Sequence, residues 1–124
     1  MSKLDNNIEQ ITVVVILYKE EFQTVVSCLN NIKNFKIIII DNANDKNLKQ
    51  KLIPHYNFYK YILNKENIGF ASAAYQGINE CVTDYAFFLT ADCLINEENI
   101  FLLLEAKKKY KDCYLTSPTF FDQQ

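Results

Sequence analysis

The stretch Ile37-Ile38-Ile39-Ile40-Asp41-Asn42-Ala43-Asn44 places four consecutive β-branched residues directly before a cluster of one carboxylate and two amides. A run that is apolar on both faces is typical of a strand covered on both sides, as in a parallel sheet flanked by helices. In open α/β sheets, ligands bind outside the carboxyl ends of the strands. The stretch therefore predicts a buried parallel strand that ends at Asp41, beside a ligand site.

The composition fits one globular domain. The chain has 124 residues, 49% of them hydrophobic, and only two Gly and two Pro, which argues against a disordered protein. A net charge of −2 gives no basis for nucleic-acid binding. No apolar run approaches the roughly 18 residues that a membrane span needs. Residues 1–10 are polar and lack the apolar region of a signal peptide. We therefore expect a flexible lead-in at 1–10 and a cytoplasmic domain over 11–124, with a peripheral membrane contact left open.

The cysteines do not indicate a metal or redox centre. None of them forms a CxxC pair, and each lies in or beside an apolar stretch. We expect all four to be reduced and to pack as small hydrophobic side chains. They are Cys28, Cys81, Cys93 and Cys113.

Strand-like and helix-like segments alternate along the chain. Strands are predicted at 11–17, 36–41, 58–63, 85–89 and 114–116. Helices are predicted at 20–33, 46–53, 70–81 and 97–111. Glu20 and Glu21 would suit the positive first turn of the first helix, Asn96 would cap the last, and the third has a face of small residues that allows close approach to the sheet. The order β-α-β-α-β-α-β-α-β predicts an α/β fold with a mostly parallel sheet and flanking helices, because strands separated by helices need crossover connections.

Polar residues follow three of the predicted strands. The three strand ends read Tyr18-Lys19-Glu20, Asp41-Asn42 and Thr90-Ala91-Asp92. Taken singly, an Asp or Asn after a strand often does no more than bond its own backbone in an Asx-turn. In a parallel sheet, however, the three ends lie on one edge, and the turn at Gly69 precedes a helix beside them. Their convergence predicts a ligand site.

The residue types at this edge suit a phosphorylated or nucleotide ligand. Asp41 is able to accept hydrogen bonds from an amide or a hydroxyl group. Asp92 offers a hard oxygen ligand to Mg²⁺ or Mn²⁺, which need only one or two carboxylates when substrate phosphates complete the shell. Gly69 permits close approach of the backbone at the start of a helix. Neither GxGxxG nor GxxxxGK[ST] occurs in the chain, so these residues alone do not specify the nucleotide class.

Four motifs between Ile11 and Asp122 match a known pattern. They are the strand tip Leu17-Tyr18-Lys19, the tip Asp41-Asn42-Ala43-Asn44, the stretch Asn67-Ile68-Gly69-Phe70-Ala71-Ser72-Ala73-Ala74-Tyr75-Gln76-Gly77-Ile78, and the acidic motif Thr90-Ala91-Asp92. The third is the most specific. On these motifs the chain resembles the nucleotide-sugar-binding half of family 2 glycosyltransferases, most of all their rhamnosyltransferase-like branch. The resemblance implies a Rossmann-like GT-A fold and inverting transfer of a sugar to an acceptor hydroxyl.

The resemblance also implies a role for each matching residue. Tyr18 would line the base, and Asp41 would hold the base or ribose. The turn from Asn67 to Gly69 would pack beside the nucleotide and the donor sugar. Thr90 stands in place of the first acidic residue of the fourth motif and lies on the donor side. Asp92 would bind the divalent metal, Mn²⁺ or Mg²⁺, that neutralises charge on the leaving diphosphate.

The partners that follow from the resemblance are a UDP- or dTDP-linked sugar and a glycan or lipid-linked acceptor, in the synthesis of cell-envelope polysaccharide. Family members are longer than this chain, and their acceptor-binding half and catalytic base lie beyond the position of Gln124. We therefore expect a donor-binding part without a catalytic base of its own. An apolar face left bare by the missing half would favour self-association.

Two other classes stay open at this point. A receiver-like signalling domain has an acidic pair after its first strand, which Glu20 and Glu21 imitate. It also needs an Asp after the third strand and a Lys after the fifth, where this chain has Leu63-Asn64 and Thr116-Ser117. A non-catalytic nucleotide-binding or interaction module would keep the predicted fold without turnover.

Overall fold

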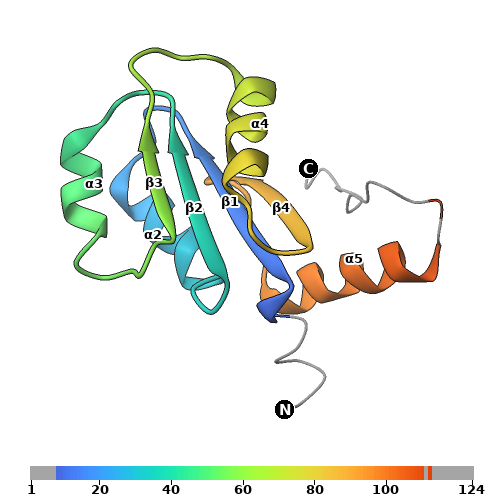
Figure 1. The fold of residues 1–124 in the computed structure, drawn as a ribbon. Helices are drawn as coiled ribbons and strands as arrows, with labels where there is room; N and C mark the ends of the chain where they lie inside the picture. Colours follow the sequence, from blue (N-terminus) through green and yellow to red (C-terminus); the bar gives the residue numbers. More distant parts are fainter. Residues whose placement is uncertain (1–7, 111, 113–124) are drawn as a thin grey trace, which may run out of the picture.

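A computed structural model of the chain describes residues 8–110 and 112, in which strands and helices alternate around one sheet (Figure 1). The elements are β1 (Ile11–Leu17), α2 (Phe22–Asn30), β2 (Lys36–Asp41), α3 (Lys46–Leu52), β3 (Lys60–Leu63), α4 (Phe70–Glu80), β4 (Tyr85–Thr90) and α5 (Glu97–Lys109). The strand order is β3-β2-β1-β4, and every pairing is parallel. The predicted α/β fold with a parallel sheet is confirmed. The fifth strand predicted at 114–116 lies outside the described residues.

The two central strands are buried on both faces. All seven residues of β1 are buried, as are Ile37 to Asp41 of β2. The strands run in register, with Val13 opposite Ile37 and Ile16 opposite Ile40. Successive side chains of a strand point to opposite faces, so a strand without polar alternation needs cover on both sides. The helices supply that cover.

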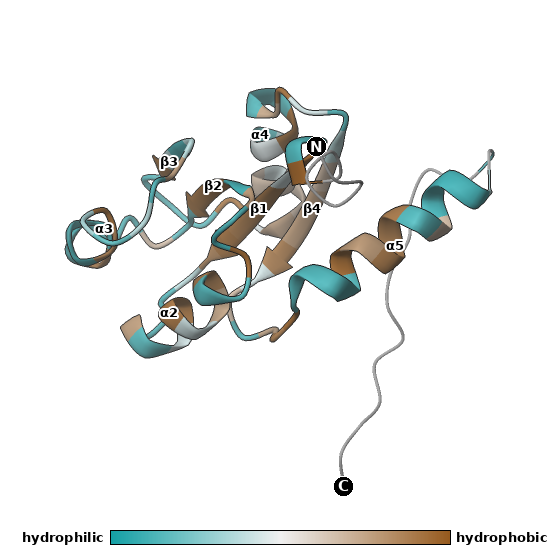
Figure 2. Ribbon diagram, turned by 90° about the horizontal axis from the view of Figure 1, so that it is seen from below, coloured by the Kyte–Doolittle hydropathy of each residue, from teal (hydrophilic) through white to brown (hydrophobic). Residues whose placement is uncertain are grey.

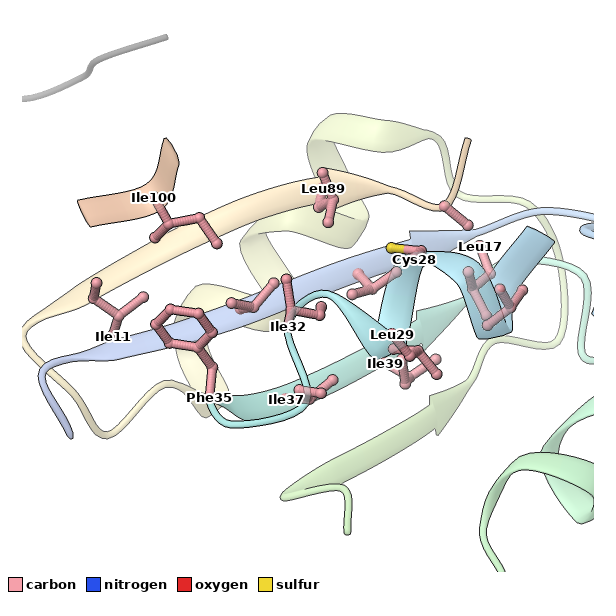
Figure 3. Packing of buried hydrophobic residues seen from close by; sticks show 14 of the residues in the cluster. Ile11, Leu17, Cys28, Leu29, Ile32, Phe35, Ile37, Ile39, Leu89 and Ile100 are labelled. Atoms are coloured by element: carbon pink, nitrogen blue, oxygen red, sulfur yellow. The ribbon is translucent and has the colours of Figure 1, made fainter. Parts of the chain in front are cut away.

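The hydrophobic cores on the two faces of the sheet differ in size. In Figure 2, the hydrophobic strands lie between α4 on one side and α2 on the other. The larger core, shown in Figure 3, packs side chains of α2, α3 and α5 against one face of the sheet. The smaller core lies under α4 and consists of Val14, Ile16, Ile38, Ile40 and Ala73.

Helix α4 lies close to the sheet because its inner face carries small residues. Ala73 is fully buried, and Gly77 faces Val14 of β1. A Cβ atom added at Gly77 would lie 2.5 Å from Val14 Cγ1 and 3.0 Å from Val14 Cγ2. This glycine is required by space, which confirms the small-residue face predicted for this helix.

The first helix begins two residues later than predicted. Lys19 has a φ of +55°, which turns the chain directly after β1, and Glu21 is extended and precedes the helix. Glu21 makes no side-chain capping bond, and no acidic residue lies in the first turn. The prediction that Glu20 and Glu21 suit that turn was therefore wrong. The helix ends at Asn30, and tight turns then carry Ile32 and the following segment into the core.

Other boundaries differ by one or two residues. β3 begins at Lys60 instead of Phe58, and the Phe58 ring packs edge-on against Tyr61, with ring centroids 5.3 Å apart. β4 continues through Thr90. The predicted cap of the last helix is confirmed: Asn96 accepts a hydrogen bond from the backbone of Asn99, whose side chain bonds back to the Asn96 backbone.

Two findings on the described part of the chain concern the cysteines and the helices. Cys28, Cys81 and Cys93 are free, while Cys113 lies outside the described residues. None of the helices formed by residues 8–110 is both long and apolar enough to cross a membrane.

We expect Gly77→Ala to lower the free energy of unfolding by about 1–3 kcal/mol, although alanine favours helices more than glycine does. Val14 is β-branched and sits in a fully buried strand, so its methyl groups have no room to move away. Urea denaturation measures the change. Ser72→Ala, at an exposed position of the same helix, is the control and should stay within about 0.5 kcal/mol of the parent. Equal stability of both variants would contradict the close approach of α4.

Candidate functional site

The carboxyl ends of the four strands meet at one edge of the sheet, as predicted. Asp41 at the end of β2 is paired with Leu17 of β1 on one side and with Leu63 of β3 on the other. On the far side of β1, Ile16 is paired with Thr90 of β4. The polar groups that follow the strands therefore form a row across this edge in the order β3, β2, β1, β4.

The direction of the chain connections reverses between β1 and β4. From β1 the chain passes through α2 to β2 and onward to β3, whereas β4 returns to the opposite side of β1 by way of α4. α2 and α4 lie on opposite faces, so the loops after β1 and β4 diverge (Figures 1 and 2). Such a topological switch point is where open α/β sheets bind ligands. Tyr18 and Asp92, each two residues beyond the pair Ile16–Thr90, flank it.

Asp41 is built into the turn that follows β2. It is 1% exposed, and its carboxylate accepts hydrogen bonds from the backbone N–H of Ala43 (2.8 Å) and of Asp45 (3.1 Å). Asn44 within this turn has a φ of +54°. Both carboxylate oxygens thus have backbone partners, as the Asx-turn interpretation expects, and each keeps acceptor capacity for a further donor.

Burial raises the pKa of Asp41 above its ordinary value of 3.8, against the opposing effect of the two backbone hydrogen bonds, and the Asp45 carboxylate adds a smaller increase. In the unfolded chain the group ionises at lower pH, so deprotonation as the pH rises through this range lowers stability. A donor or cation placed beside Asp41 would offset that cost.

A pair of carboxylates flanks the switch point. Asp92 is exposed and Glu20 is half-buried. The pKa of Glu20 is raised first by burial and second by the negative charge of Asp92, so the two groups interact. Within residues 8–110 and 112, no three His, Cys, Asp or Glu side chains converge as a metal centre. The pair therefore offers a cation two carboxylate groups and leaves the remaining positions to a ligand and water.

Thr90 lies beside this pair, and its hydroxyl contacts a thiol. Thr90 Oγ1 is 3.5 Å from Cys93 Sγ. Beneath them, burial raises the pKa of Cys28 to about 12, with smaller contributions from Cys93, Asp92 and Glu20. The thiol of Cys28 is therefore neutral and acts as a core residue, in agreement with the expectation from sequence.

A chain of side-chain amides joins the other strand ends to α4. Asn42 Nδ2 donates to the carbonyl of Gly69 (3.2 Å), and Asn42 Oδ1 accepts from Asn64 Nδ2 (2.9 Å). Asn64 and Gln76 exchange two hydrogen bonds of 2.8 Å each. Asn67 Oδ1 accepts the N–H of Gly69 at 2.9 Å within the exposed turn. The turn before α4 is thus tied to the ends of β2 and β3.

Gly69 itself is required by its backbone conformation. It precedes α4 with φ of +84° and ψ of 170°, a region essentially restricted to glycine, and no atom lies within 4 Å of a Cβ built there. The exposed backbone at this point leaves room for close approach, and the role of Gly69 toward a ligand stays a prediction.

The structure brings most of the predicted residues to one edge and adds others. Tyr18 (45% exposed), Asn67, Gly69 and Asp92 are accessible, whereas Asp41 is covered. Sequence reasoning included Glu20 and Asn42 among the polar strand ends without giving either a role of its own, and it assigned no site role to Asn64 or Gln76. Asn42 and Asn64 each stand at the end of an apolar run, a position from which the sequence alone can predict a residue at the strand edge. Nothing in the sequence marks Gln76 as an edge residue, because a polar residue in the middle of a helix usually faces solvent.

Comparison with known proteins assigns the family. The sequence pattern of "Glycosyl transferase family 2" matches residues 12–124, nearly the whole chain. The chain belongs to glycosyl transferase family 2. The family resemblance read from the motifs is thereby confirmed. No curated protein matches this family 2 chain by sequence.

Solved structures share the fold of this family 2 domain. The crystal structure of S. aureus TarS superposes with a TM-score of 0.63 at 19% identity, over 81% of this chain and 20% of that one. The crystal structure of S. aureus TarS 1-349 gives a TM-score of 0.63 at 16% identity, over 82% of this chain and 33% of that one. The chain thus spans a fifth to a third of the length of these proteins, and the likeness supports the GT-A-like fold.

The strand order also decides against the receiver-like alternative. Receiver domains have the order 2-1-3-4-5, in which the third strand lies beside the first. Here β3 pairs with β2, and β4 takes the place beside β1. Glu20 and Glu21 imitate the acidic pair of a receiver only in sequence.

Replacing Asp92 by Asn should lower the pKa of Glu20 partway toward its ordinary value, because a neighbouring negative charge is removed while burial remains. An NMR titration of the Glu20 carboxyl group measures this shift. Asp84→Asn, exposed at the opposite end of β4, is the matched control and should leave Glu20 unchanged. An identical Glu20 pKa in the parent and Asp92→Asn would show that the two carboxylates do not meet at the switch point.

Proposed function

We propose that this domain binds the nucleoside diphosphate sugar donor of a glycosyltransferase that transfers the sugar, with inversion, to an acceptor hydroxyl. Membership of family 2 supports a sugar-transfer role in general. The observation that carries the proposal is the row of polar groups at the switch point. Asp41 ends β2 and Asp92 lies two residues beyond β4, and these two strands lie on either side of β1, roughly 10 Å apart.

That separation suits one extended ligand better than one ion. Two carboxylates at such a distance do not share a cation directly, but they can contact different parts of a single molecule. In the proposed arrangement, Asp41 accepts hydrogen bonds from the base or ribose, and Tyr18 on β1 lies alongside the base. The turn of Asn67 and Gly69 approaches the nucleotide and the sugar, and Thr90 lies on the donor side.

The residues at the β4 end fit Mg²⁺ or Mn²⁺. Asp92 would hold the ion, and Glu20 is a second carboxylate, which interacts with Asp92. Diphosphate and water would complete the shell, as is usual for Mg²⁺ sites with few protein ligands. The ion would supply positive charge to the leaving diphosphate. The chain's own contribution is to orient the ligand between the ends of β2 and β4.

The finer assignments are part of the same proposal. The donor is a UDP- or dTDP-linked sugar, of hexosyl or rhamnosyl type, and the acceptor is a glycan or a lipid-linked saccharide of the cell envelope. The domain acts in the cytoplasm, with a peripheral contact at the inner face of the membrane. A catalytic base outside the donor-binding part and self-association of the domain stay predictions.

UDP or dTDP, with Mn²⁺ or Mg²⁺, should raise the melting temperature of the domain, because a ligand that binds only the folded state stabilises it. At a free concentration of about 100 Kd the gain is about 2.7 kcal/mol, or roughly 10 °C for a domain of this size. A thermal-shift panel of nucleoside diphosphates with and without each metal measures it. If no nucleoside diphosphate stabilises the domain, the donor-site proposal is wrong.

In the same panel, Asp92→Asn should remove the additional stabilisation that metal gives to the nucleotide complex, while the metal-free nucleotide shift persists. The reason is that an amide is a much poorer ligand for a hard cation than a carboxylate. Asp84→Asn serves again as the control for the change of charge. A metal effect of equal size in Asp92→Asn would refute the metal assignment.

Asp41→Asn should weaken nucleotide binding about tenfold with or without metal, because the carboxylate would lose one acceptor oxygen and its charge. Isothermal titration with UDP and dTDP measures the affinity. Asp45→Asn is the matched control, since Asn caps α3 as well as Asp does. Asp41→Asn with parental affinity would disprove the contact assigned to Asp41 and leave the Asx-turn as its whole role.

A further inference from the structure

We propose that the amide chain Asn42–Asn64–Gln76 is a positioning network that holds the Gly69 turn against the strand edge and thereby sets the affinity for the donor. The inference rests on the proposed donor site and extends it to side chains that need not touch the ligand. Its basis is the unbroken series of hydrogen bonds between mid-α4, the end of β3, the end of β2 and the turn itself.

The network closes a ring in the structure. Asn64 and Gln76 bond each other through both amide groups, at 2.8 Å each way, so the residues between them form a loop fastened at its ends. Asn64 uses its second N–H on Asn42, and Asn42 in turn donates to the carbonyl of Gly69 inside that loop. The loop is therefore fastened at its base and again near its middle.

Burial makes this arrangement specific. Asn42 and Asn64 are 4% and 9% exposed, and a buried amide without a partner is costly. Asn64 satisfies both its donor hydrogens and its carbonyl oxygen within the network. Each member thus fixes the rotamer of the next, and few other arrangements would satisfy the three amides together.

Apart from the amide chain, one side chain of the turn, the partly buried Ile68, packs against the smaller core. Residues 65–67 and 69 are exposed, and Asn67 bonds only to the nearby Gly69 N–H among its side-chain bonds in the described structure. The φ of +84° at Gly69 belongs to a residue with wide backbone freedom. Farther along, α4 packs on the sheet through Ala73 and Gly77. The apolar contact of Ile68 has no preferred direction, whereas the amide chain bonds the backbone of Gly69 itself and so fixes its orientation.

The main test uses Gln76→Met, which keeps the length and bulk of the side chain and removes both hydrogen bonds to Asn64. The expected result is affinity for UDP and dTDP about tenfold lower by isothermal titration, measured well below the melting temperature. Gln23→Met, at an exposed position of α2, is the matched control and should bind like the parent. Gln76→Met with parental affinity would overturn the inference while the donor-site proposal stands.

A double-mutant cycle separates positioning from direct contact. If Gln76 acts through Asn64 and Asn42, then adding Gln76→Met to Asn42→Ala should cause much less than a further tenfold loss. Fully multiplicative losses would contradict the network and indicate independent ligand contacts. If the parent protein binds neither UDP nor dTDP, the proposed function is wrong, and the proposed effect of the network on donor affinity is wrong as well.

Hydrogen–deuterium exchange tests the positioning role without any ligand. In Gln76→Met, the hydrogen-bonded amides of Gly69 and Ala73 should exchange about tenfold faster, while those of β2 and α5 stay as in the parent. This measurement applies even where the double variant does not fold. Unchanged exchange in the turn would overturn the inference, as would a uniform increase across the domain, which marks general destabilisation.

Discussion

The pairing of β1 with β2 is the interaction on which the rest of the structure depends. Both strands are apolar on both faces, and their backbones bond in parallel from Thr12–Lys36 to Leu17–Asp41. Parallel neighbours require crossover helices, and two buried faces require helices on both sides. The chain meets both demands by sending α2 and α3 to one face and α4 to the other. The reversal between β1 and β4 follows, and with it the place where a ligand can enter.

The same pairing explains why the end of β2 is polar and yet ordered. Asp41 and Asn42 are nearly inaccessible, so each polar atom there needs a partner within the protein. Asp41 finds backbone N–H groups of its own turn, and Asn42 finds Asn64 and Gly69. One edge thus combines a covered half on β2 and β3, whose polar groups bond within the protein, with an accessible half at Tyr18 and Asp92. Such a division suits a site that must hold one part of a ligand firmly and admit the other together with a cation.

The strands, the capping of α5 by Asn96 and the small inner face of α4 could all be predicted, because each depends on neighbouring residues or on a single periodicity. The start of α2 could not. The acidic pair Glu20–Glu21 reads as a first turn, but Lys19 turns the chain and keeps the pair outside the helix. Gln76 escaped prediction because its partner, Asn64, is twelve residues away on another element. The strand-end residues were predicted as a group, whereas the covered state of Asp41 was not.

By itself, the sequence determined the number and type of the central elements, the family and the set of strand-end residues, since these follow from local patterns along the chain. The tertiary structure decided which strand lies beside which, and therefore that Asp92 and Tyr18 flank the switch point while Asp41 lies one strand farther along. It also decided that the Asp41 carboxylate serves its own turn and that Gln76 belongs to the edge. These properties depend on contacts between segments far apart in sequence, whose geometry is fixed only when the sheet and both helical layers pack together.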